Sequence, residues 1–433
     1  MTTNNTYSRP VYVVDGSRTP FLKALNGPGP FRASDLAVAA ARPLLARQPF
    51  LPDLLDEVIL GCVSSGPDEA NIARVVALRL GCGDLVPAWT VQRNCASGMQ
   101  ALDNAAHNIA SGRSNLVLAG GTEAMSHHPI ILNNRMVSWL AQWNRAKTVT
   151  AKGKQLLELR PSHFQLIIAL LRGLTDPVVG LSMGQTAEKL AWRFNISREA
   201  MDSFAVTSHQ RLDQAHQAGR LDEIEPIFDS KGRLYDFDNG LRADSSEEKL
   251  ARLKPVFDRP VGNVTAGNSA QVTDGAAMLL LASEEAVKEH NLPIMGRIVD
   301  TQWSALDPSQ MGLGPVHAMA RLLQRQGSDG KDVDYWEINE AFAAQVLACL
   351  EAWKDPEYMQ NELGIETPFQ PIPTDRLNVD GGAISIGHPV GASGARVVLH
   401  MLNTLRLNQA QRGIASLCIG GGQGGAMLLE VEA

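Results

Sequence analysis

The sequence has few cysteines, and none of them are closely paired. It contains five among 433 residues, namely Cys62, Cys82, Cys95, Cys349 and Cys418, and no C-x-x-C pair occurs. This spacing excludes a zinc finger and a framework of disulfides, and it favours a reducing compartment. We therefore expect free thiols.

Long apolar runs and an excess of positive charge are also missing. The longest apolar runs, such as residues 166–171, are far too short to span a bilayer. The polar start, MTTNNTYSRP, has no apolar core, so we expect no secretory signal and a cytoplasmic protein. The formal net charge of −7 provides no general attraction for nucleic acid.

The chain does contain short apolar strands that alternate with helical stretches and small-residue turns, which predicts a layered α/β fold. Its length allows two or three domains. The expected strands are 11–15, 58–60, 88–92, 116–119, 294–299, 336–338, 377–379 and 414–418. The expected helices are 36–46, 71–80, 97–111, 184–194, 198–218, 316–326, 339–352 and 392–407.

The two halves of the chain have a similar order of elements. Each has a strand, a turn that contains glycine or cysteine, a long helix of small residues, and a final strand followed by glycines. We interpret them as two copies of one α/β unit. Residues 126–258 between them do not fit the unit, and we expect them to carry binding surface rather than core.

Cys95 lies in the run Asn94-Cys95-Ala96-Ser97-Gly98, where a predicted strand leads into a predicted helix. Backbone amides at a helix N-terminus stabilise a thiolate and can bind a developing oxyanion. The alternative is a buried structural cysteine, because free cysteine is often buried in cores.

Two later runs are harder to explain by packing. His388 lies between Gly387 and Pro389 just before a helix, where it can serve as the base for a thiol. Cys418 ends a strand and precedes Gly420-Gly421-Gly422. This glycine run also fits G-x-G-x-x-G, but only eight residues follow Gly425, so there is no room for the crossover helix of a dinucleotide site.

A fourth run, Asn339-Glu340-Ala341-Phe342, places an amide and a carboxylate at a turn from strand to helix. Together with the start Gly16-Ser17-Arg18-Thr19-Pro20-Phe21, the four runs resemble the thiolase family in order and spacing over nearly the whole chain. The resemblance implies two related domains, each a five-stranded mixed sheet packed with helices, and a loop domain that caps the site. It places the N-terminal domain at 1–125 and 259–284, the loop domain at 126–258 and the C-terminal domain at 285–433.

The resemblance also implies the catalytic roles. Cys95 becomes acylated, His388 deprotonates it, and Cys418 moves a proton at the α-carbon of acetyl-CoA. Asn339 holds a water that forms one oxyanion hole with His388, and the amides of Cys95 and Gly420 form the other. Two half reactions that each develop an oxyanion need two sets of donors and two proton carriers, in agreement with these roles.

Coenzyme A thioesters are the implied substrates, with no tightly bound cofactor and no metal. The implied acyl-CoA contacts are Met183, Arg242, Ser269, Met311 and Phe342. Two positions depart from the family pattern. Ser182 stands where many short-chain thiolases have a histidine, and Ala270-Gln271 replaces a Ser-Gly pair. Other runs, such as 253–260, resemble the thiolase subunit of fatty-acid oxidation complexes.

Two other functions compete with a thiolase. A decarboxylating ketosynthase shares the fold but uses a Cys-His-His set, and here the third position is Cys418. A non-catalytic acyl-CoA or lipid carrier would lack the nucleophile or the base, and this chain has both. Within thiolases, cleavage of 3-ketoacyl-CoA and biosynthetic formation of acetoacetyl-CoA use the same residues, because the chemistry is reversible. The resemblance further implies a homodimer or tetramer.

Residues 133–173 are locally basic within an acidic protein, with seven Lys and Arg against Glu158 alone. Apolar residues and two tryptophans, Trp139 and Trp143, lie among these cations. We predict a helical flap that serves longer acyl chains and that contacts anionic lipid or a hydratase–dehydrogenase partner. The alternative is that the segment packs on the loop domain or on a second copy of the chain.

Overall fold

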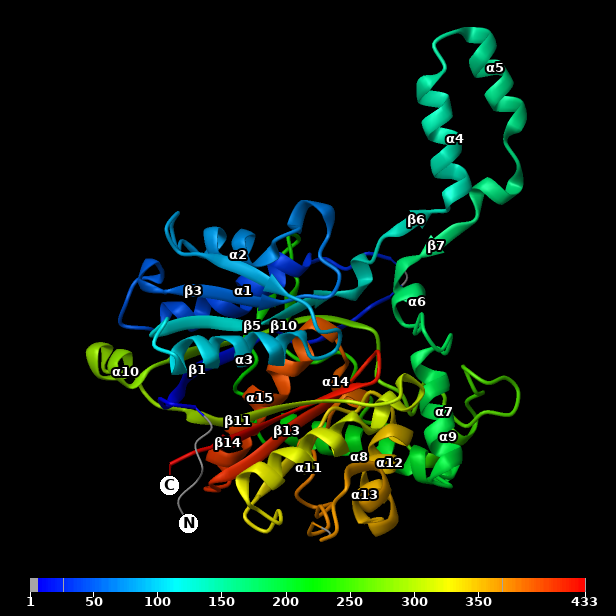
Figure 1. The fold of residues 1–433 in the computed structure, drawn as a ribbon. Coiled ribbons are helices and arrows are strands. Elements are labelled where there is room, and N and C mark those ends of the chain that lie inside the picture. The colour runs from blue at the N-terminus through cyan, green and yellow to red at the C-terminus, as the bar shows by residue number, and fades with distance from the viewer. Residues whose placement is uncertain (1–6, 26, 368, 433) are drawn as a thin grey trace.

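Strand β1 (Val11–Arg18) lies at the middle of the sheet that organises the molecule. The computed structural model describes residues 7–25, 27–367 and 369–432. On one side β1 pairs antiparallel with β10 (Thr273–Ala282), and on the other it pairs over three residues with β11 (Gly296–Ala305). This short second contact joins two half-sheets, one from each half of the chain (Figure 1).

The two half-sheets both mix parallel and antiparallel strands. The first has the order β4–β3–β5–β10–β1 and the second the order β12–β13–β14–β11. The bounds are β3 (Glu57–Gly61), β4 (Ala88–Val91), β5 (Leu116–Ala124), β12 (Tyr335–Ile338), β13 (Arg412–Ile419) and β14 (Gln423–Glu430), and β2 (Leu22–Lys23) pairs with β10. The α/β class predicted from the sequence is therefore what the structure contains.

The second half-sheet has four strands where five were expected. The strand predicted at 377–379 is reduced to a single bridge between Leu377 and Trp336. Asn378 has a left-handed backbone (φ 48°), which cannot continue a strand. Strands β10 and β14 were not predicted, because their leucine-rich and alanine-rich runs lack the alternation that distinguishes a strand from a buried helix.

Helices form three layers around the half-sheets. Helices α1 (Ala33–Ala46) and α2 (Ile72–Leu80) pack outside the first half-sheet, and α11 (Gly314–Gln326) packs outside the second. Helices α3 (Ser97–Ala110) and α15 (Val390–Leu407) lie between the two half-sheets (Figure 1). A buried apolar cluster fills each of the resulting interfaces.

Helices α3 and α15 approach closely because glycines lie at their contact. A Cβ atom on Gly98 would lie 2.9 Å from the Gly391 carbonyl oxygen, and one on Gly121 would lie 2.0 Å from the same oxygen. A Cβ atom on Gly394 would lie 2.6 Å from the Met99 nitrogen. The first turns of both helices therefore meet backbone to backbone, at a contact that we call the helix junction. No larger residue fits there without displacing backbone.

A loop region connects β5 to β10. It contains α6 (Ala169–Gly173), α7 (Met183–Arg193), α8 (Arg198–Gln217), α9 (Glu247–Ala251), β8 (Ile227–Phe228) and β9 (Leu234–Tyr235). Fully buried Arg18 of β1 binds Asp238 of this region with both terminal nitrogens, at 2.7 and 2.8 Å, and Glu223 through Nε at 3.0 Å. These buried pairs anchor the loop region to the sheet.

Residues 130–168 form an arm that projects from the loop region (Figure 1). Its stalk is a ribbon of β6 (Ile130–Leu132) and β7 (Leu166–Ile168), and its tip is a hairpin of α4 (Asn134–Arg145) and α5 (Val149–Glu158). At the base of the hairpin the Asn133 amide donates to the carbonyls of Ser162, His163 and Gln165. The sequence predicted the helices of this segment but not the two-stranded ribbon that carries them.

The remaining helices lie in both halves, with α10 against β1 and β10 of the first half-sheet, and one prediction among them was wrong at its start. Helix α12 (Ala343–Lys354) begins four residues later than the predicted helix 339–352, and residues 339–342 form a non-helical turn instead. The others are α10 (Glu284–His290), α13 (Pro356–Leu363) and α14 (Ala383–Ile386). Within the described ranges, no helix is both long and apolar enough to cross a membrane.

Candidate active site

Cys95 lies in the turn between β4 and α3, at the helix junction. The preceding residue, Asn94, has a left-handed backbone (φ 44°), which asparagine tolerates better than most residues. Its amide nitrogen donates to the carbonyl of Gly420 at 2.8 Å. The nucleophile turn and the glycine run after Cys418 are therefore held together directly.

The Cys95 sulfur lies among backbone donors. Burial raises the pKa of the Cys95 thiol, while the N–H of Gly420 and that of Cys95 itself lower it. The two amides that the sequence predicted as an oxyanion hole thus both point at this sulfur. They can stabilise negative charge on the thiolate or on an oxygen that develops beside it.

Cys418 is the second thiol of the site and lies near the end of β13. It is buried, and both burial and the neighbouring Cys95 raise its pKa well above the ordinary value. Cys418 therefore remains protonated at neutral pH and can donate a proton. Strands β13 and β14 form a hairpin around Gly420–Gly422, so this glycine run is not followed by a dinucleotide-binding helix.

His388 directly precedes Pro389, which caps the N-terminus of α15. Its Nδ1 lies 2.6 Å from Ser393 Oγ, and that hydroxyl donates to the Pro389 carbonyl, so Nδ1 carries the hydrogen. Nε2 is buried without a partner, and burial with the nearby Arg396 charge lowers the pKa of His388 to about 4. The imidazole is therefore neutral, and Nε2 is free to accept a proton.

Asn339 follows β12 and is also buried with free side-chain atoms. Its backbone N–H donates to the Ser416 carbonyl, while neither Oδ1 nor Nδ2 has a hydrogen-bond partner. Buried amides are rarely left unpaired, so these two atoms mark a place for water or substrate. The water held by Asn339 stays a prediction.

A cavity of about 270 Å³ opens beside Cys95. Its lining is mostly apolar and comes from the nucleophile turn, the loop after β3, the glycine turn between β13 and β14, the starts of α7 and α15, and the two segments that flank the arm. The lining residues are Val63, Asn94, Cys95, Met125, His128, Leu170, Gly173, Leu174, Thr175, Asp176, Pro177, Val178, Met183, Val390, Gly420 and Gly421. An apolar cavity next to a thiol suits an acyl chain.

The predicted acyl-CoA contacts are not all at this cavity. Met183 lines it, and Phe342 is buried and packs edge-on against Phe257. Ser269 gives its hydroxyl to the Thr265 carbonyl, and Met311 is buried in the apolar core of the second half. Arg242 is exposed, and of the five residues Met183 alone lines the cavity, so all five substrate contacts stay predictions.

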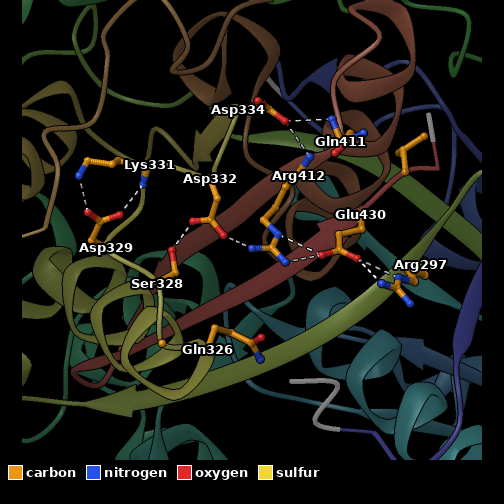
Figure 2. Close-up of a pocket in the computed structure, with 12 residues that line it drawn as sticks. Arg297, Gln326, Ser328, Asp329, Lys331, Asp332, Asp334, Gln411, Arg412 and Glu430 are labelled. Atoms are coloured by element: carbon orange, nitrogen blue, oxygen red, sulfur yellow. Dashed lines mark hydrogen bonds and ion pairs between the residues drawn. The ribbon is translucent and has the colours of Figure 1, made fainter. Parts of the chain in front are cut away.

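A larger cavity of about 940 Å³ lies elsewhere, between the end of α11 and strand β14, and it is polar (Figure 2). Glu430 receives the guanidinium groups of Arg297 and Arg412, and Arg412 also reaches Asp332. The charged groups at its centre thus bind one another, and its lining contains no cysteine or histidine. Among the described residues no cluster of three or more metal-ligating side chains occurs.

Several residues of the site were not singled out from the sequence. Ser393 orients His388, Asn94 holds Gly420, and His128 and Leu170 line the cavity. Ser393 and Asn94 lie within the runs that identified the site, so proximity along the chain was a usable signal. His128 and Leu170 come from the ends of the arm, and no pattern in the sequence places the arm beside Cys95.

Comparison with known proteins decides the family. The description "Thiolase, N-terminal domain" matches residues 11–285, and "Thiolase, C-terminal domain" matches residues 292–431. The chain belongs to the thiolase family. It is an acyltransferase with the thiolase fold, as the sequence predicted.

Three relatives illustrate the similarity of this thiolase to known proteins. A 3-ketoacyl-CoA thiolase of Yersinia enterocolitica is 35% identical over 98% of this chain and 97% of its own. The mitochondrial trifunctional enzyme subunit beta of Bos taurus is 37% identical over 98% of this chain and 88% of its own. The crystal structure of human mitochondrial 3-ketoacyl-CoA thiolase in complex with CoA is 36% identical, covers 98% of both chains and has a TM-score of 0.83.

Proposed function

We propose that this thiolase cleaves 3-ketoacyl-CoA with coenzyme A, giving acetyl-CoA and an acyl-CoA shortened by two carbons. The observation that supports this most strongly is the arrangement around Cys95. Its sulfur faces the amides of Cys95 and Gly420, a second protonated thiol lies beside it, and an apolar cavity opens next to it. The named 3-ketoacyl-CoA thiolases among its relatives favour this direction over biosynthesis of acetoacetyl-CoA.

In the first half reaction, His388 Nε2 takes the proton of Cys95, and the thiolate attacks the 3-keto carbon. The bond between carbons 2 and 3 then breaks, and Cys418 gives its proton to carbon 2, which leaves as acetyl-CoA. The shortened acyl group remains on Cys95. The amides of Cys95 and Gly420, and a water held by Asn339 with His388, bind the developing oxyanions.

In the second half reaction, the thiol of coenzyme A gives its proton to the Cys418 thiolate and attacks the Cys95 thioester. The tetrahedral intermediate collapses, the acyl-CoA leaves, and Cys95 takes back its proton from His388, which restores the starting state of all three residues. A chain-length series of 3-ketoacyl-CoA substrates tests the proposal, measured by loss of the substrate on addition of coenzyme A. Turnover of six-carbon and longer substrates is expected, and turnover of acetoacetyl-CoA alone would instead support the short-chain biosynthetic function.

The arm is proposed to serve partners as well as substrate. Its exposed apolar side chains include Val137, Leu156, Leu157 and Phe164, and seven cations lie between residues 133 and 173. Apolar residues beside cations suit the surface of an anionic membrane. Trp139 and Trp143 are half-buried: they stack on each other, and Trp139 donates to the Gln155 carbonyl.

Sedimentation with vesicles tests membrane contact by the arm. The intact protein is expected to sediment with phosphatidylglycerol vesicles and less with phosphatidylcholine vesicles, and binding should fall when Lys152 and Lys154 are both changed to Glu. Equal binding to both vesicles, or none, would contradict it. A homodimer or tetramer and a hydratase–dehydrogenase partner are further parts of the proposal, and ultracentrifugation of the protein alone and with such a partner tests them.

A further inference from the structure

Glu123, near the end of β5, is a buried carboxylate that the proposed mechanism does not use. It is fully buried, and no Lys, Arg or His of the described chain forms an ion pair with it. Burial raises its pKa to about 7 against the pull of its hydrogen bonds. A buried carboxylate without a cation is costly, so its partners need an explanation.

Those partners are backbone N–H groups from both halves of the site, together with the Cys62 thiol, whose Sγ lies 3.8 Å from Oε1. Oε1 accepts from Ser64 at 3.0 Å, and Oε2 accepts from Val63 at 2.9 Å and from Gly391 at 3.1 Å. Val63 lines the Cys95 cavity, and Gly391 lies in the first turn of α15, three residues after His388. The Glu123 carboxylate thus links the cavity wall of the first half to helix α15, which begins directly after His388 and Pro389.

The contact with Gly391 also solves a capping problem. The N-cap of α15 is Pro389, whose side chain offers no acceptor to the unpaired N–H groups of the first turn. Glu123 of strand β5 supplies that acceptor, and a negative charge is favourable at a helix N-terminus. A Cβ atom on Gly391 would lie 2.7 Å from Glu123 Oε2 and 2.4 Å from the Thr122 carbonyl, so glycine is what admits the carboxylate.

We propose that Glu123 is a positioning residue for catalysis, which fixes the start of α15, and with it His388, relative to Cys95. It touches neither substrate nor reacting atoms and acts through the backbone of residues 63–64 and 391, while its charge also raises the pKa of the Cys95 thiol. The proposal rests on the roles proposed above for Cys95 and His388. Misplacing a catalytic group by about 1 Å can cost on the order of a hundredfold in rate, so a shift of this helix start has a measurable effect.

The test compares Glu123→Gln with a matched control, Glu188→Gln. A glutamine at 123 turns one acceptor oxygen into an NH₂ group, which faces an N–H donor. Glu188 of α7 is also buried and accepts from two backbone N–H groups, Asn263 at 2.9 Å and Val264 at 2.8 Å, but away from the helix junction. Both variants lose a carboxylate that accepts hydrogen bonds from backbone amides, but only Glu123→Gln loses the link between the two halves.

Four quantities are measured for each variant: kcat and KM for thiolysis of acetoacetyl-CoA, the rate of alkylation of Cys95 by iodoacetamide, and Tm. Glu123→Gln is expected to lower kcat and the alkylation rate by roughly ten- to a hundredfold with KM changed little. Glu188→Gln is expected to lower Tm and to leave the other quantities within about twofold. Glu123→Asp, which keeps the charge on a shorter side chain, is expected to fall between wild type and Glu123→Gln.

Equal losses in the two glutamine variants would overturn the proposal. If Glu123→Gln does not accumulate as folded protein, Glu123→Asp takes its place in the test. A wild-type kcat and a wild-type alkylation rate in Glu123→Asp would also overturn the proposal. Failure of the proposed function looks different. In that case alkylation of Cys95 in the wild-type protein would leave thiolysis intact, whatever the variants at position 123 do.

Discussion

The helix junction and the arm differ in how their residues are packed. At the junction, glycines bring α3 and α15 into backbone contact. His388 Nε2 and the side-chain amide of Asn339 are buried there without a hydrogen-bond partner. The arm instead exposes leucines and a phenylalanine that nothing in the monomer covers. The comparison indicates that the junction carries chemistry that tolerates little movement, while the arm carries contacts that are completed by something else.

Removing the proton carriers should separate the two chemical steps at the junction. His388→Ala is expected to slow acylation of Cys95 itself by about 10²- to 10⁴-fold, because the nucleophile loses its base. Cys418→Ala is expected to keep acylation by acetyl-CoA but to lose Claisen condensation, which needs a proton taken from carbon. Single-turnover acylation and condensation rates check this, and near-normal condensation by Cys418→Ala would give that cysteine a structural role only.

A pair of alanine substitutions tests the contrast in packing. Gly121→Ala places a methyl group against the Gly391 backbone and is expected to destabilise the protein by about 3 kcal/mol and to reduce kcat. Gly153→Ala in α5 of the arm meets no atom within 4 Å and is expected to stabilise its helix by about 0.5–1 kcal/mol. Urea unfolding measures both, and equal effects would remove the contrast.

The pH dependence of Cys95 alkylation tests the electrostatics of the junction. The pKa of His388 is lowered to about 4, so the base stays neutral as the pH falls from 8 to about 5. The pKa of the Cys95 thiol is raised, so its alkylation should accelerate with rising pH through the neutral range. An inflection near pH 6.5 that disappears in His388→Ala would show instead that His388 titrates normally.

Shortening the arm is expected to have the smallest effect on chemistry. Replacing residues 134–164 with a short glycine-serine link removes the hairpin and keeps the stalk and the cavity residues Leu170 and Leu174. We expect turnover of acetoacetyl-CoA within about twofold of wild type and a larger loss for a ten-carbon substrate. An equal loss on both substrates would give the arm no part in chain length.

The junction was largely predictable from the sequence, and the arm was not. Cys95, His388, Cys418 and Asn339 each lie in a short run at the end of a predicted strand or the start of a predicted helix, and that position singled them out. The predicted helix at 339–352 was wrong at its start, because residues 339–342 form a turn that frees the Asn339 side chain.

Contacts between distant segments could not be predicted in the same way. Glu123 lies 268 residues before Gly391, and its role depends on that one glycine, which admits the carboxylate, rather than on any local pattern. The arm was predicted as helical from its composition, but its ribbon stalk and the approach of its base to the Cys95 cavity depend on tertiary packing.

Acylation of Cys95 tests the central claim most directly. The protein is incubated with radiolabelled acetyl-CoA, digested, and the labelled peptide is identified by mass spectrometry. The account predicts one acetyl group per chain on Cys95, lost in Cys95→Ala and retained in Cys418→Ala. Label on Cys418 with none on Cys95 would contradict it.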